Sequence, residues 1–277
     1  MSSHGYRIIA ASLSVALYLG CEKAEESPVR AISSQSQSSS ESEVSVPSQL
    51  EYEVVEVPDG GQVRGRVRVS GPPPNLEDLL VEKDQGVCGE TAPNRALRLS
   101  PEGGVEGAIV TLAGITSGVG LRPLPGPAKV EITKCRLFPH VLLVPLGSTL
   151  EIVNNDSILH DIRAHLGETM LFDVALPIQH FRAQHRLELP GIVNLTSGAG
   201  HIWVSGYVVV KDHPYYARTD ARGAYTIDAI PPGSYDLRVW HELLEGEESV
   251  LIVEPDTTVT VDFSLEAPDT DTSGTGK

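Results

Sequence analysis

Residues 215–242 have the sequence YYARTDARGAYTIDAIPPGSYDLRVWHE, and this stretch decides the fold class. Its side chains alternate between apolar and polar, as in a strand that buries one face, and Tyr235, Leu237 and Val239 are the clearest set. Turn residues divide the stretch at 231–233, because proline presets a negative φ and glycine accepts a positive one. The stretch therefore predicts short strands joined by tight turns.

The same pattern extends over the rest of the chain from Gly61 onward, where we find no convincing helix. The other expected strands are 63–69, 107–112, 129–133, 141–145, 149–153, 185–189, 192–195, 203–210, 250–253 and 258–263. Many short strands at this spacing indicate β-sandwiches. Since 277 residues are enough for about two domains with tails, we expect an all-β chain with two sandwiches.

The overall charge limits the class of partner. The chain carries 37 acidic residues against 21 lysines and arginines, a formal net charge of −16. A nucleic-acid-binding protein needs a basic face that neutralises phosphates, so we expect no nucleic-acid partner. Such an acidic surface favours a soluble domain that repels its own copies.

The N-terminus has the pattern of an export signal. Arg7 precedes an apolar run, 8–20, that is too short to span a bilayer as a stable helix. The run ends at Cys21 and resembles a bacterial lipobox, in which small residues precede a cysteine that is lipidated after cleavage. The resemblance implies a signal peptide over 1–21 and a lipid anchor at Cys21. The alternative is an ordinary signal peptide with a chance cysteine.

Polar segments flank the expected sandwiches. Residues 22–50 are rich in Ser, Gln and Glu, and residues 266–277 form a short polar tail. Both have too few apolar side chains to offset the entropy of ordering, so we expect disorder there. A flexible tether after Cys21 would hold a folded domain clear of a membrane surface. We therefore expect a lipoprotein of the bacterial cell envelope, periplasmic or at the outer membrane, with the membrane as a partner.

Two motifs within 215–242 carry a family resemblance. A T-D-x-x-G-x-Y motif begins at Thr219, and a P-P-G-x-Y-x-L motif begins at Pro231. Together they resemble carboxypeptidase regulatory-like domains, and the resemblance covers residues 212–265. It implies a small transthyretin-like β-sandwich that adds structure or interaction surface and carries no catalytic residue.

The preceding region resembles bacterial cupredoxin-like proteins that are fused to such a domain. The segments that carry this resemblance are CRLFPHV at 135–141, GSTLEIVNND at 147–156, LHD at 159–161 and SGAGHIWV at 197–204. It implies a cupredoxin-like β-sandwich, to which we assign residues 61–211. The strand at 62–70 has a second assignment, because G-x-V-x-G-x-V also begins regulatory-like domains. The cupredoxin-like part would then be an insertion in the C-terminal sandwich.

The same resemblance implies a copper site that has lost ligands. His160 and His201 stand at the positions of the two imidazoles, Ser197 at that of the cysteine and Val204 at that of the methionine. A blue-copper site needs the thiolate for its strong short bond, and usually a weak axial thioether. We therefore expect no cofactor and vestigial histidines. The alternative is a repurposed site in which His160 and His201 weakly bind copper or zinc.

Cys88 and Cys135 are the two cysteines that remain once Cys21 is lipidated. In an oxidising compartment they form the natural disulfide pair. The alternatives are a free thiol or a copper ligand at Cys135.

The sequence does not favour catalysis. Ser197 and His201 superficially suggest a nucleophile and its base, but no strand-to-helix nucleophile elbow is present. We therefore predict a binding or structural module for a protein or carbohydrate partner, with no catalytic residue and no enzyme activity. The aromatic side chains that could serve carbohydrate binding are Trp203, Tyr215, Tyr216 and Trp240.

Overall fold

The computed structural model describes residues 52–267. The expected signal peptide, Cys21 and the tether at 22–50 lie outside this range, as does the tail beyond residue 267. Between 52 and 267 the chain forms strands β1 to β21 and one short α-helix, α1 (Gln85–Cys88). The prediction of an all-β fold is confirmed. No helix in this part of the chain is long and apolar enough to cross a membrane.

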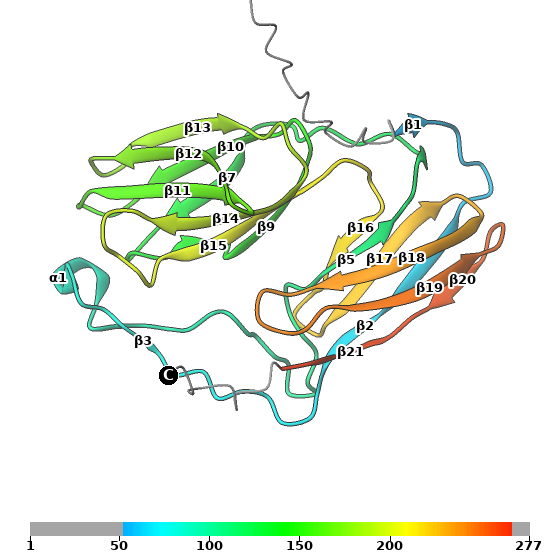
Figure 1. Cartoon of the computed structure of the whole chain (residues 1–277), viewed down its shortest axis with the longest axis horizontal. Coiled ribbons are helices and arrows are strands. Elements are labelled where there is room, and N and C mark those ends of the chain that lie inside the picture. The colour runs from blue at the N-terminus through cyan, green and yellow to red at the C-terminus, as the bar shows by residue number, and fades with distance from the viewer. Residues whose placement is uncertain (1–51, 268–277) are drawn as a thin grey trace, which may run out of the picture. The chain divides into compact units, whose positions relative to one another are not determined.

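Two sheets in the middle of the chain form a β-sandwich, here named the central sandwich (Figure 1). One sheet has the strand order β13-β10-β7-β8 and the other β12-β11-β14-β15-β9. The strands are β7 (Ala128–Ile132), β8 (Leu137–Phe138), β9 (Val141–Pro145), β10 (Thr149–Asn154), β11 (His160–Leu166), β12 (Thr169–Leu176), β13 (Arg182–Arg186), β14 (Gly191–Ser197) and β15 (Ser205–Lys211). Strands β7 and β10 run parallel, as do β9 and β15. Parallel neighbours cannot be joined by a tight hairpin, so the chain crosses between the two sheets.

Aliphatic side chains on the inner faces make the core of the central sandwich. On β14, Val193 and Leu195 are buried while their neighbours are partly exposed, the alternation of a strand with one face inward. Leu150 and Ile152 of β10 belong to the same apolar cluster. A core built this way fits a chain in which aromatic residues make up only 5%.

A second pair of sheets forms the C-terminal sandwich (Figure 1). One sheet has the order β16-β5-β18-β19, and the other has the order β17-β2-β20 with β21 also paired to β2. The strands are β2 (Gly61–Ser70), β5 (Ile109–Ala113), β16 (Tyr216–Arg218), β17 (Ala224–Ile230), β18 (Gly233–Trp240), β19 (Glu247–Val253), β20 (Thr258–Thr260) and β21 (Phe263–Glu266). Val63, Val67 and Leu237 are fully buried in its core.

The strand pairing differs from the prediction that residues 61–211 form one domain. Strand β2 pairs with β17, where Arg66 lies opposite Ala224, and β5 pairs with β18, where Leu112 lies opposite Leu237. Both strands therefore belong to the C-terminal sandwich, and the central sandwich is inserted between β5 and β16. Alternation along a strand shows that it has a buried face but does not encode which distant strand lies beside it.

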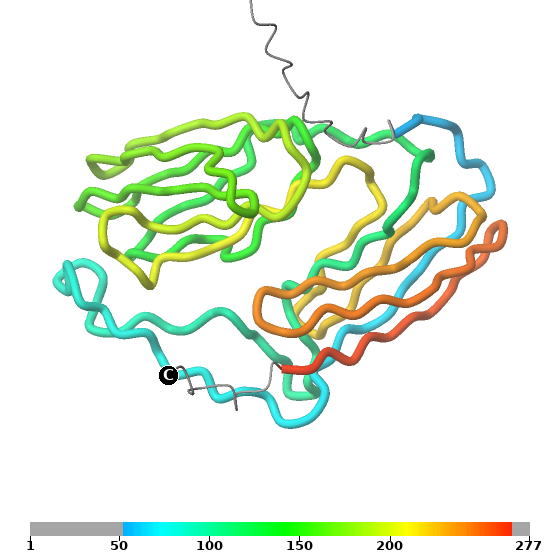
Figure 2. The backbone as a smooth tube through the Cα atoms, viewed as in Figure 1, coloured from blue at the N-terminus to red at the C-terminus, as the bar shows by residue number. Residues whose placement is uncertain are grey.

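Residues 79–92, between β2 and β5, form a segment that we call the strap. It consists of the antiparallel pair β3 (Leu79–Leu80) and β4 (Thr91–Ala92), with α1 between them. Val81, Cys88 and Ala92 are buried and belong to the apolar cluster of the central sandwich. The chain thus leaves the C-terminal sandwich after β2, packs the strap on the central sandwich and returns as β5 (Figure 2). Near the start of the described chain, β1 (Glu53–Val54) pairs with β6 (Ser117–Gly118).

Two shielded histidines, His213 and His241, act as hydrogen-bond acceptors. The Nδ1 atom of His213 accepts from the backbone N–H of Tyr215, and that of His241 accepts from those of Leu243 and Leu244. Burial lowers the pKa of each imidazole from 6.5 to about 4, because the charged form would lose its hydration. Both rings are therefore neutral in the folded protein at neutral pH.

We expect the free energy of unfolding to fall as the pH decreases from 6.5 to about 4. Over this range the unfolded chain takes up protons on both imidazoles while the folded chain does not, so acid favours unfolding. The free energy of unfolding falls by at most about 3 kcal/mol per histidine over this range. In urea unfolding measured across this range, His213→Gln should show a smaller fall, and the exposed control His180→Gln should follow the parent. Identical profiles for His213→Gln and the parent would contradict this account.

Candidate metal centre

His160 and His201 lie side by side in the central sandwich. His160 is the first residue of β11, and His201 lies in the loop between β14 and β15. Both side chains are fully buried, and their ring centroids are 5.1 Å apart. Two histidines that are 41 positions apart in the chain therefore form one cluster.

The turn before β11 fixes the position of His160. The side-chain amide of Asn154, at the end of β10, donates to the carbonyl oxygens of Ile158 and Leu176, while its oxygen accepts from the backbone N–H of Asp156. The Asn154 side chain therefore holds both sides of this turn. Antiparallel pairing of His160 with Leu176 then sets the direction of β11.

Asp156 holds the outer nitrogen of His160. Its Oδ2 atom lies 3.0 Å from Nε2 of His160, and its two oxygens accept hydrogen bonds from the backbone N–H groups of Lys134 and Cys135, each at 2.7 Å. Burial acts to raise the pKa of Asp156, but the hydrogen bonds from His160, Cys135 and Lys134 outweigh it and lower the pKa. The carboxylate therefore stays ionised and can only accept, so Nε2 of His160 carries the proton.

The strap supplies the matching carboxylate for His201. Oδ2 of Asp84, the residue before α1, lies 2.8 Å from Nε2 of His201. The adjacent Lys83 donates from Nζ to the carbonyl oxygen of Ala199, in the same loop as His201. The indole ring of Trp203 packs against His201 in a T-shaped arrangement, with the ring centroids 5.3 Å apart.

The inner nitrogens of the two rings have no partner. Nδ1 of His160 and Nδ1 of His201 are both buried without a hydrogen bond to any described residue. A histidine that binds a metal usually donates its other ring N–H to a carboxylate, which fixes the tautomer and leaves a lone pair for the ion. Both histidines have this arrangement, so the Nδ1 atom of each ring has a lone pair that a metal ion could use.

A disulfide bond lies beside the two histidines. Cys88, at the end of α1, is joined to Cys135, and both are buried. One ligand atom each of Cys88, Cys135 and His201 lie within 4.8 Å of one another, and the same holds for Cys135, Asp156 and His160. The disulfide expected from the cysteine count is therefore present, and it connects the strap to the histidine cluster.

The residues at the expected cysteine and methionine positions offer no strong ligand. Ser197 ends β14 opposite Ile162, and its hydroxyl oxygen accepts from the backbone N–H of Ala199. Val204 is buried and has no donor atom in its side chain. A neutral hydroxyl does not replace the thiolate of a blue-copper site.

Two other histidines of the central sandwich, His140 and His185, have different surroundings. His140 contacts the carboxylate of Glu242, and the ring of His185 lies 4.4 Å from that of Phe172. Asp84 and Asp156 are the functional candidates that sequence reasoning did not name. Asp156 ends the segment 147–156 that carried the cupredoxin-like resemblance, which was a usable signal, but nothing near Asp84 in the sequence points to His201.

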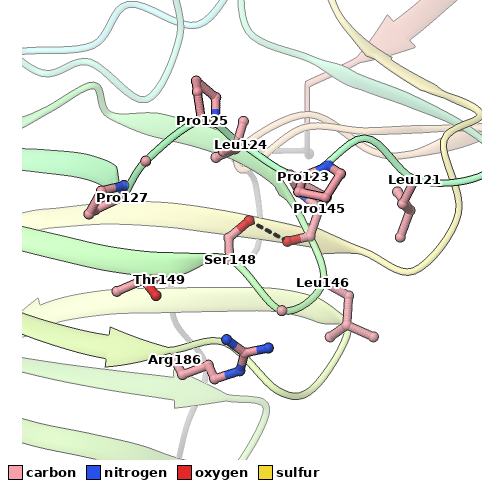
Figure 3. A pocket seen from close by; sticks show the side chains of 12 residues that line it. Leu121, Pro123, Leu124, Pro125, Pro127, Pro145, Leu146, Ser148, Thr149 and Arg186 are labelled. Atoms are coloured by element: carbon pink, nitrogen blue, oxygen red, sulfur yellow. Dashed lines mark hydrogen bonds between the residues drawn. The ribbon is translucent and has the colours of Figure 1, made fainter.

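A separate cavity of about 470 Å³ lies at the segment 121–127 and the turn 145–149, with Arg186 on one side (Figure 3). Prolines and leucines make much of its lining, and the Ser148 hydroxyl donates to the carbonyl oxygen of Pro145. None of its lining residues is aromatic. Trp203 and Tyr215, two of the aromatics considered for carbohydrate binding, are buried and present no face for stacking.

Residues 193–266 match the family model of the carboxypeptidase regulatory-like domain. This match begins in β14 of the central sandwich and does not include β2 or β5, which complete the sheets of the C-terminal sandwich. No curated protein sequence matches the chain.

Part of the chain is similar to solved copper proteins. A purple cupredoxin from Nitrosopumilus maritimus is 24% identical over 30% of this chain and 99% of its own, with a TM-score of 0.27. Amicyanin from Paracoccus versutus is 17% identical over 37% of this chain and 97% of its own, with a TM-score of 0.29. The copper-containing nitrite reductase of Thermus scotoductus SA-01 is 24% identical over 33% of this chain but only 23% of its own, with a TM-score of 0.27. Values this low transfer no ligand, activity or site residue to this chain.

The described residues thus form an all-β fold with two β-sandwiches, and residues 193–266 match the carboxypeptidase regulatory-like domain.

We expect loss of the disulfide to weaken the fold. In the chain-entropy model, a bridge across a sequence separation of 47 residues contributes about 4 kcal/mol. Urea unfolding of the double variant Cys88→Ala, Cys135→Ala in a Cys21→Ser background should show a loss of this order relative to Cys21→Ser alone. Free-thiol labelling of Cys88 and Cys135 in the natively isolated protein would contradict the pairing.

Proposed function

We propose that this chain is a non-catalytic lipoprotein of the bacterial cell envelope whose central sandwich binds a divalent transition metal through His160 and His201, without blue-copper electron transfer. One observation carries the metal proposal. Each imidazole is fully buried, with its outer nitrogen held by a carboxylate and its inner nitrogen unpaired.

Burial of two unpaired nitrogen atoms has an energetic cost. A buried acceptor without a partner forfeits its hydration, which costs about 1–3 kcal/mol per group. A cation bound between the two rings, whose centroids are 5.1 Å apart, would give the Nδ1 atoms a partner, while the nearby carboxylates of Asp84 and Asp156 would offset its charge. Imidazole is a suitable ligand for Cu(II), Ni(II) and Zn(II), so these are the ions that we expect.

The described donor set argues against blue copper. The only sulfur ligands near the histidines are Cys88 and Cys135, and these are joined to each other in this part of the chain. Val204 has no thioether, and Ser197 has only a hydroxyl. The bound ion would therefore lack the thiolate on which blue-copper electron transfer depends, which favours a metal-binding or structural role.

The envelope assignment rests on the N-terminal pattern and on the disulfide. An apolar run that ends at Cys21, followed by a polar tether, is the pattern of a lipid-anchored export product. A buried disulfide is typical of a protein that folds in an oxidising compartment, which supports export. We therefore propose that the membrane is a partner through the lipid on Cys21.

The oxidised protein should bind about one equivalent of Cu(II) or Zn(II) in a calorimetric titration, as expected for a single site with two imidazole ligands. His160→Gln and His201→Gln should each weaken binding strongly, because each removes one imidazole, whereas His185→Gln should leave it unchanged. The copper-loaded protein should show only weak visible absorption, because no thiolate is available for charge transfer. Equal binding in all three variants would remove the proposed site, and an intense blue colour would overturn the assignment of its chemistry.

Membrane retention should depend on Cys21. After expression in a bacterial host, the wild-type chain should fractionate with membranes and Cys21→Ser should not, since a mature lipoprotein needs several acyl chains for stable anchoring. The matched control is Ser33→Ala, a small change within the tether that leaves Cys21 intact and should stay with the membranes. A wild-type chain found in the soluble periplasmic fraction would contradict the anchor.

A further inference from the structure

The Cys135 sulfur is shared by the surroundings of both histidines. It lies within 4.8 Å of a ligand atom of His201 in one cluster and of a ligand atom of His160 in the other. Cys88 belongs only to the cluster with His201. A disulfide that served stability alone could close the chain at any pair of suitable positions, whereas this one brings two sulfur atoms to two imidazoles with unpaired nitrogens.

We propose that the Cys88–Cys135 disulfide is a redox-controlled lock on this centre. Reduction converts a two-imidazole site into a site with thiolate and imidazole ligands. In that site the sulfur of Cys135 would bind the metal ion together with the histidines. Such a site favours Zn(II) or Cu(I) over ions that prefer nitrogen and oxygen ligands. This inference rests on the proposed function in using the same His160 and His201.

The reductant is a dithiol of the thiol–disulfide exchange class. Its two S–H groups give up two electrons and two protons and close its own disulfide, while the Cys88–Cys135 bond breaks and both sulfur atoms become thiols. A metal ion then displaces the proton from each sulfur that becomes a ligand. Oxidation by a disulfide of the same class reverses the step and releases the ion.

The distances require only a small rearrangement. In a tetrahedral zinc site with bonds of about 2.0–2.3 Å, ligand atoms lie about 3.3–3.8 Å apart. Within each cluster the ligand atoms lie within 4.8 Å of one another, so a shift of roughly an ångström brings Cys135 and one histidine to the spacing of such a site. His160 and His201 belong to different clusters, so a site with both imidazoles also requires one ring to move, and the two sulfur atoms must move apart. Cys135 is held in its turn by Asp156, so we expect Cys88 to move.

The strap is the element that permits this movement. Its hairpin is paired over only two residues on each side, and α1 is one helical turn of four residues. Residues 82–86 are exposed, so a single turn of backbone separates the disulfide from solvent. Elements with so few contacts open locally at low free-energy cost, which would admit the reductant.

The first test compares oxidised and reduced protein with Co(II) as a spectroscopic probe for zinc. The Cys21→Ser protein has Cys88 and Cys135 as its only cysteines. After native reduction with a trialkylphosphine, which contributes no thiol, Co(II) should produce sulfur-to-cobalt charge-transfer absorption that is absent from the oxidised protein. Bound Co(II) without this absorption, or resistance of the disulfide to reduction under native conditions, would overturn the lock.

The second test uses a matched pair of variants. Cys88→Ser and Cys135→Ser both remove the same disulfide, so they share its effect on stability and differ in which sulfur remains. Without any reductant, Cys88→Ser should show the charge-transfer absorption and should lose it when His160→Gln is added. Cys135→Ser should bind Co(II) more weakly by an order of magnitude or more, because it lacks the shared sulfur ligand. Equal affinity and equal spectra for the two variants would show that Cys135 is not the shared ligand.

These results separate the two proposals. If the oxidised protein binds Cu(II) through the histidines but the reduced protein shows no thiolate absorption, the lock is wrong and the two-imidazole site stands. If His160→Gln and His201→Gln leave Cu(II) binding by the oxidised protein unchanged, the two-imidazole site is wrong. Thiolate absorption that is present in reduced protein but insensitive to both histidine variants would also overturn the lock.

Discussion

The Asp156 carboxylate accepts hydrogen bonds from the backbone N–H groups of Lys134 and Cys135 and holds Nε2 of His160. Lys134 and Cys135 have positive φ values of 50° and 56°, a conformation that side chains other than glycine seldom adopt. Two charge-assisted hydrogen bonds offset this local cost, and they also offset the burial of the charge. The turn, the ring orientation of His160 and the position of the disulfide therefore depend on one ionised group.

The strap connects the histidine cluster to the C-terminal sandwich. It follows β2 and precedes β5, two strands that the C-terminal sandwich needs to complete its sheets, yet it packs in the core of the central sandwich. Asp84 and Cys88 are its two contributions to the metal centre, one through His201 and one through the disulfide. The surroundings of the two histidines therefore depend on the strap, a short element with little secondary structure of its own.

This coupling underlies the two donor sets that we propose for the centre. Ser197 and Val204 provide neither thiolate nor thioether, but the sulfur of Cys135 lies close to both imidazoles. In the oxidised protein that sulfur is bonded to Cys88, and the imidazoles are the available ligands. The same side chains thus define two different donor sets, and the oxidation state of one bond selects between them.

The sequence by itself determined the all-β class, many of the strands, the turn-rich C-terminal sandwich and the cysteine pair, because alternation, turn residues and cysteine parity are local or countable properties. It did not predict β11, which begins at His160, or β12. Only the tertiary structure decided between the two assignments of β2, placed β5 in the C-terminal sandwich and brought Asp84 to His201. These contacts join residues far apart in the chain, and a strand or a lone aspartate carries no local signal of its distant partner.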